Sequence, residues 1–134
     1  MLKHAVDRAE ATPKQLAALK LIQSVDDSFQ NSIDDAAEQF RAWVDGRVDL
    51  SSEGLGAINR ANIRDHYQIY TVRIPWQDGE SLHYFLDCSC DWEEEHGMQM
   101  LVRDMDIVLC GQNDCSFDWA SMEKEIAEFQ SRKL

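Results

Sequence analysis

The sequence lacks several features that would assign the protein to a familiar class. No run approaches the ~20 apolar residues of a membrane-spanning helix, and the first eight residues hold no apolar signal core, which predicts a cytoplasmic protein. Only 2 of the 134 residues are proline, and no linker divides the chain, so we expect one domain. The motifs G-x-S-x-G, G-x-G-x-x-G and the P-loop are absent, so we expect neither an enzyme nor a cofactor.

Basic residues are also scarce. The chain has 13 Lys and Arg against 25 Asp and Glu, a net charge of −12. This balance argues against nucleic acid and against an anionic membrane surface as partners. It favours a basic protein partner, although high negative charge also serves solubility alone. Acidic residues concentrate between residues 78 and 118, where Arg103 is the only base, so we expect the acidic surface on the C-terminal half.

Helical periodicity dominates the first half of the chain. After a flexible leader at residues 1–11, Thr12 is a suitable cap for a first helix. A second helix is expected to begin near residue 31 and to end at Gly46. Apolar spacing predicts a short third helix over residues 52–61.

The period then changes to two, which is typical of strands. The turn sequence at residues 77–80 separates the first two strands, and a final helix is expected over residues 121–132. The sequence therefore predicts an α+β fold over residues 12–134, in which N-terminal helices pack on one face of an antiparallel β-meander of about four strands, with a C-terminal helix. The expected strands span residues 67–74, 82–90, 98–103 and about 107–110.

The most distinctive segment is Cys90-Asp91-Trp92-Glu93-Glu94-Glu95-His96-Gly97, which interrupts two strands. Three adjacent carboxylates and an imidazole resist burial, which predicts an exposed loop with Gly97 at a positive φ. Trp92 is expected to brace the loop from beneath rather than to face solvent. The residues that we expect to bind a partner are Asp91, Trp92, Glu93, Glu94, Glu95 and His96.

This run resembles the C-x-W-x-E-E-H-G signature of a family of bacterial proteins of unknown function. Residues 15–19 look like the opening helix of that family, residues 105–112 like its later strand and glycine, and residues 116–119 like its closing element. Family members often carry Leu-Gly after the His-Gly pair, where this chain has Met98-Gln99. The resemblance supplies no activity, but small acidic proteins of this type look like immunity proteins that neutralise a secreted toxin.

The alternative function is a metal-binding protein, structural or catalytic. His96 stands three residues after Glu93, and the four cysteines also form a possible zinc set. The plainer interpretation is four reduced thiols, with Glu94 or Glu95 and His96 satisfying backbone groups of the loop. A nucleophilic pair of Cys90 and His96 is disfavoured, because acidic surroundings oppose a thiolate. The sequence leaves open whether the protein is a monomer or a homodimer.

Overall fold

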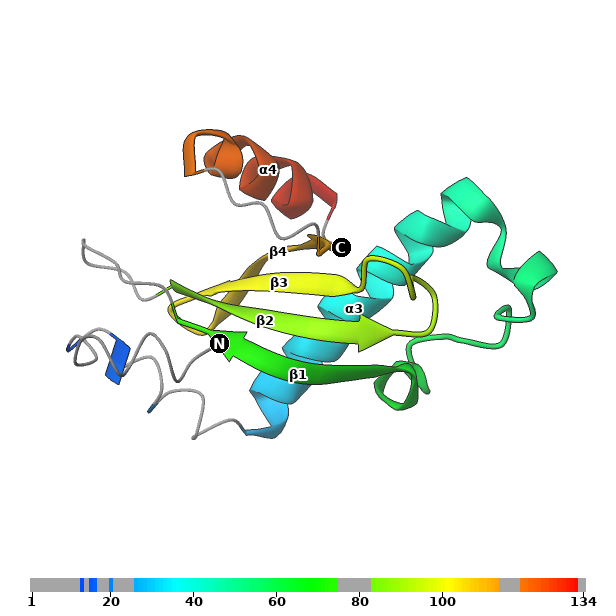
Figure 1. The fold of residues 1–134 in the computed structure, drawn as a ribbon, viewed down its shortest axis with the longest axis horizontal. Helices are drawn as coiled ribbons and strands as arrows, with labels where there is room; N and C mark the ends of the chain where they lie inside the picture. Colours follow the sequence, from blue (N-terminus) through cyan, green and yellow to red (C-terminus); the bar gives the residue numbers. More distant parts are fainter. Residues whose placement is uncertain are drawn as a thin grey trace.

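The protein is described by a computed structural model of one α+β unit. Its four strands form a single antiparallel sheet in the order β1-β2-β3-β4, and α3 runs diagonally behind that sheet (Figure 1). This arrangement confirms the predicted fold class. The structure describes residues 13, 15, 16, 20, 26–74, 83–113 and 119–132.

The long helix α3 spans Asp27–Val48 and begins earlier than predicted. The side chain of Asp26 caps it by accepting a hydrogen bond from the backbone N–H of Phe29 at 2.9 Å. The helix was predicted to end at Gly46, but this residue lies within it. The end comes at Asp49, whose φ of 49° is left-handed, a conformation that aspartate tolerates better than most residues. The buried apolar residues of α3 are Phe29, Ile33, Ala36, Ala37, Phe40 and Val44.

The prediction of a third helix over residues 52–61 is wrong. Two short 3₁₀ turns take its place, η1 at Leu50–Glu53 and η2 at Ile63–His66. Gly54 ends η1 with a φ of 79°, which removes the chain from helical geometry. Leu55 and Ile58, whose spacing suggested a helix, instead anchor an irregular segment to the core. The buried Leu50 and Ile63 anchor the chain on either side of them.

The sheet is a meander, as predicted. Its strands are β1 (Tyr67–Arg73), β2 (His83–Cys90), β3 (Met98–Arg103) and β4 (Asp106–Gln112). The turn between β3 and β4 falls one residue earlier than predicted, at Asp104 and Met105. Both residues have positive φ, 50° and 77°, as a tight two-residue hairpin requires.

The final helix α4 spans Trp119–Arg132 and lies beside β4 (Figure 1). Phe129 joins the main core between α3 and the sheet. Ile126 instead packs with a second buried cluster that includes Phe85 and Leu101, on the sheet face away from α3. The sheet is therefore covered on both faces near β4, where the sequence predicted helices on one face.

Parts of the prediction lie outside the described residues. These are the leader at residues 1–11, the turn at residues 77–80 and Cys115. The few described residues of the first helix include Gln15, whose side-chain amide donates to the backbone oxygen of Ile74 at 2.9 Å. Within the described residues, no helix combines the length and the apolar character needed to cross a membrane.

Candidate partner-binding site

The loop at residues 91–97 joins β2 to β3, and its conformation depends on Gly97. This residue has a φ of 73°, which confirms the predicted positive angle. Its backbone N–H donates to the backbone oxygen of Glu93 at 2.9 Å. A Cβ atom at position 97 would lie 2.7 Å from the backbone oxygen of Cys88, too close for any side chain. Only glycine suits both the angle and the space.

Trp92 lies beneath the loop, where it has the predicted role of a brace. Its side chain is 4% exposed and belongs to the main core. The indole packs edge-on against Phe40 of α3, with the ring centroids 6.5 Å apart. The indole N–H finds no hydrogen-bond partner in the part of the chain that the structure describes. Trp92 thus ties the loop to α3 through packing alone.

Glu93 is turned back into the loop rather than toward solvent. One of its carboxylate oxygens accepts hydrogen bonds from the backbone N–H of His96 at 3.3 Å and from the ring Nδ1 of His96 at 3.1 Å. The other accepts from Gln112 of β4 at 3.0 Å. Burial alone would raise the pKa of Glu93, but the hydrogen bonds from Gln112 and His96 outweigh it and lower the pKa. Glu94 or Glu95 was predicted to accept from the backbone of the loop. The residue that accepts from the backbone N–H of His96 is instead Glu93.

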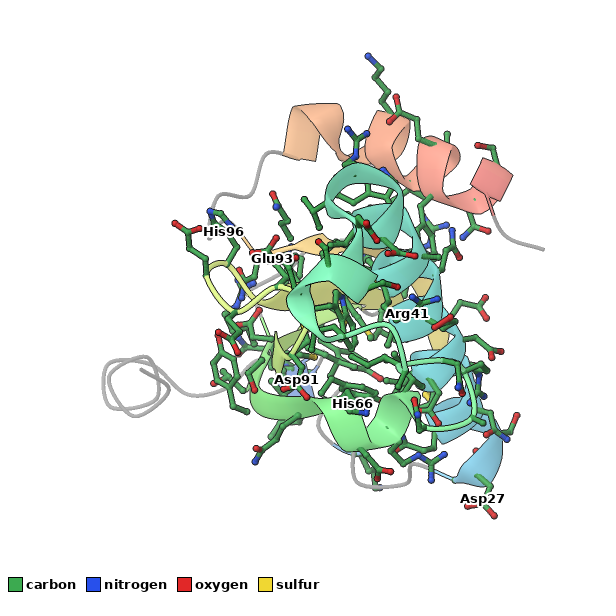
Figure 2. All side chains as sticks on the ribbon, turned by 90° about the vertical axis from the view of Figure 1, so that its right-hand side faces the viewer. Asp27, Arg41, His66, Asp91, Glu93 and His96 are labelled. Carbon is green, nitrogen blue, oxygen red and sulfur yellow. The ribbon has the colours of Figure 1, made fainter. Side chains whose placement is uncertain are left out.

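Asp91 is exposed and is held by His66, which was not among the predicted site residues. Its carboxylate lies 2.8 Å from Nδ1 of His66, and its backbone N–H donates to the backbone oxygen of His66 at 2.9 Å. Figure 2 shows this pair side by side, apart from the pair of Glu93 and His96. The register of the sheet is the cause, because Tyr67 pairs with Cys90 and the residues just beyond them are neighbours.

A surface hollow of about 320 Å³ opens beside the pair of His66 and Asp91. Its lining residues include Asp65, Asp91 and Glu94 together with His66. Asp65, Glu94 and the neighbouring Glu95 are all exposed. We call the four carboxylates Asp65, Asp91, Glu94 and Glu95 the acidic end.

Asp34 of α3 holds the chain on both sides of His66 by binding Arg64 and Tyr67. Asp34 is 1% exposed, and its carboxylate accepts from Arg64 of η2 at 2.9 and 2.6 Å. It also accepts from the hydroxyl of Tyr67 at 2.6 Å and from the side chain of Gln30 at 3.2 Å. Because Arg64 and Tyr67 flank His66 in sequence, this buried carboxylate ties the segment that carries His66 to α3.

Most arginines in the described ranges are already neutralised within the molecule. Their ion pairs are Arg41–Glu38, Arg60–Asp35, Arg64–Asp34 and Arg73–Asp87. At the acidic end, by contrast, no ion pair joins Asp65, Glu94 or Glu95 to another described residue, and Asp91 has only the imidazole of His66. The negative charge at this end is therefore largely uncompensated by the chain itself.

Among the residues that the structure covers, no group of three or more His, Cys, Asp and Glu side chains is placed to hold a metal ion. Cys88 and Cys90 are buried in the core, and burial raises the pKa of each thiol to about 12. Such thiols are not nucleophiles at neutral pH. Cys110 is also buried, and Cys115 lies outside the described residues, so the four-cysteine site remains a prediction.

The fold and the site together define a small α+β protein with an acidic surface at one end of its sheet. The chain belongs to the family described as Domain of unknown function (DUF6985), whose model matches residues 2–117. The matched region includes the loop and all four strands, whereas α4 lies beyond it. No curated protein and no solved structure gives a significant match to the chain.

Proposed function

We propose that the protein is a binding protein that recognises a basic protein partner through the acidic end. The observation that carries this proposal is the contrast in charge pairing. Four arginines of the described ranges are neutralised internally, whereas Asp65, Glu94 and Glu95 gather at one end without an internal cation. A set of uncompensated charges attracts an oppositely charged surface, speeds encounter and rejects partners of the same sign.

The most specific form of the proposal is an immunity protein that neutralises a secreted bacterial toxin. Its support is the small size, the net charge of −12 and the resemblance of the loop to a bacterial family signature. A toxin that acts on nucleic acid carries a basic active site or groove. The acidic end would inhibit such a toxin by occluding that surface, with Asp91, Glu94 and Glu95 facing the partner and Trp92 and Glu93 holding the loop in shape.

The test compares two double variants that change the net charge equally at different places. The first is Glu94→Lys with Glu95→Lys, at the acidic end. The matched control is Asp106→Lys with Glu128→Lys, which changes two exposed acids on β4 and α4, outside the loop. A partner captured with the wild-type chain is purified, and its affinity for each variant is measured by calorimetry.

We expect the variant at the acidic end to lose at least about tenfold in affinity, since reversing two charges replaces attraction by repulsion. The control should lose no more than about threefold. Equal losses in both variants would remove the acidic end from the interface, and a captured partner that is acidic would contradict the proposal outright. If the protein is an immunity protein, co-expression of the wild-type chain with the captured protein must restore growth of the host cells. Co-expression of the acidic-end variant must not restore it.

A further inference from the structure

We propose that the open edge of β1 pairs with the β1 edge of a second copy of the chain, so that the two sheets join into one continuous antiparallel sheet. This inference goes beyond the proposed function and does not depend on it. β1 forms one edge of the sheet, whereas α4 lies beside the other edge strand, β4 (Figure 1). None of the residues of β1 is buried, although most of its neighbour β2 is.

The pairing of β1 with β2 fixes which backbone groups of β1 point outward. The backbone N–H of Asp91 donates to the backbone oxygen of His66, so these two residues form a hydrogen-bonded pair. Because hydrogen-bonded pairs alternate with pairs that are not, the N–H and C=O groups of Tyr67 and Ile69 point away from β2. Val72 has the same orientation, because its partner in β2 lies an even number of residues from theirs. No hydrogen bond joins these outward groups to another residue that the structure describes, so they can bond to an added strand.

This edge lacks most of the features by which proteins prevent edge-to-edge pairing. Residues 67–72 contain neither a charged residue nor proline, in a chain with a net charge of −12. Five of these six residues are aromatic or β-branched, the types that favour strands. A bulge interrupts the edge between Ile69 and Thr71, and it leaves a regular stretch on either side.

A two-fold axis at this bulge fits the two stretches of one copy to those of the other. Tyr67 of each copy then lies opposite Val72 of the other, and their outward groups meet as a hydrogen-bonded antiparallel pair. The side chains of both residues pack against the main core, so they lie on the same face of the sheet. Gln68 lies opposite Thr71, and both are exposed. Apolar side chains therefore meet on one face of the joined sheet, and neutral polar side chains meet on the other.

The charges at the two ends of β1 favour a second copy over other strands. Asp65 precedes β1, whereas Arg73 ends it. The same register places Arg73 of each copy opposite His66 of the other, and His66 is hydrogen-bonded to the carboxylate of Asp91. β1 thus carries its own electrostatic complement, whereas a strand that is basic throughout would meet Arg73 at one end.

The experiment measures the dimerisation of the full chain by sedimentation equilibrium, from about 1 μM to about 1 mM protein. The test variant is Thr71→Glu, which places a negative charge on the edge, close to the acidic end of the second copy. The matched control is Ala42→Glu, which adds the same charge at an exposed position of α3. Circular dichroism confirms that each variant is folded.

We expect a reversible dimer whose dissociation constant rises about tenfold in Thr71→Glu, because like charges on neighbouring strands repel and the new charge occurs twice in a two-fold interface. Ala42→Glu should change the constant by no more than about twofold. A chain that stays monomeric up to about 1 mM, or equal constants for the two variants, overturns the inference.

A second measurement needs no variant. Hydrogen exchange followed by NMR should find the backbone amides of Tyr67 and Val72 exchanging rapidly in dilute solution and slowly at high protein concentration. The amides of Gln68 and Arg73, which point toward β2, should exchange slowly at both concentrations. Rates for Tyr67 and Val72 that do not depend on concentration contradict the inference. Protection of these two amides by the captured basic partner, in a chain that stays monomeric, would assign the edge to that partner and overturn the inference.

Discussion

Replacing Asp34 with alanine is expected to destabilise the protein by about 3 kcal/mol, because it removes a buried carboxylate with several donors. Arg64 donates to this carboxylate from η2, Tyr67 from β1 and Gln30 from within α3. A hydrogen bond to a charged group contributes about 1.5–3 kcal/mol. The loss stays below the sum of these contributions, because the side chain of Arg64 is 58% exposed and regains water when its partner is removed.

The matched control is Asp35→Ala, on the next residue of the same helix. Asp35 pairs with Arg60 at 2.7 Å, but its side chain is 71% exposed, so its removal should cost about 0.5 kcal/mol. Urea unfolding followed by circular dichroism measures both variants. With a denaturant slope of about 1.5 kcal/mol per molar, the Asp34 variant should unfold at a urea concentration about 2 M below that of the wild type.

The effect of Asp34→Ala should also depend on pH. Burial alone would raise the pKa of Asp34, but the hydrogen bonds from Arg64, Tyr67 and Gln30 outweigh it and hold the pKa below the ordinary value of 3.8. Because the pKa of Asp34 is lower in the folded protein than in the unfolded chain, the stabilisation is complete above pH 3.8. It is lost as the pH falls through the pKa of the folded protein. Equal effects of the two variants at neutral pH, or an effect of Asp34→Ala that persists unchanged in strong acid, would mean that the ionised Asp34 does not stabilise the fold.

Three further predictions concern the loop and the core beneath it. Gly97→Ala should destabilise the fold by about 2 kcal/mol, whereas Gly46→Ala, in open space on α3, should be neutral or stabilising, as urea unfolding will show. Iodoacetamide at mildly alkaline pH should leave Cys88 and Cys90 unlabelled in the native chain, because burial raises the pKa of each thiol to about 12. Mass spectrometry should find both labelled after denaturation. Trp92→Ala should cost about 3–4 kcal/mol, and Trp92→Phe less than half of that, because the indole N–H forms no hydrogen bond within the described residues.

The strands and the exposed loop were predictable because their signals are local. Alternation with a period of two marks the strands, and the run of charges at residues 91–96 resists burial. The helix predicted over residues 52–61 failed for a physical reason. Leu55 and Ile58 pack on the core from an irregular path, and periodicity alone cannot distinguish this case from a short helix.

The contribution of His66 was missed because it depends on strand register, although a signal for it existed. The turn predicted at residues 77–80 lies midway between positions 66 and 91, so a simple hairpin would already pair them. The observed pairing of Tyr67 with Cys90 follows that register. The inward turn of Glu93 had no such signal, because nothing in three consecutive glutamates distinguishes the one that meets His96 and Gln112.

Hydrogen exchange of the wild-type chain, with and without its captured basic partner, shows where that partner binds. We expect slower exchange of the backbone amides of residues 65–68 and 89–97 in the complex, and unchanged exchange around the turn between β3 and β4 at the other end of the sheet. Protection confined to that turn or to α4, with the acidic end exchanging as in the unbound protein, would mean that the acidic end does not bind the partner.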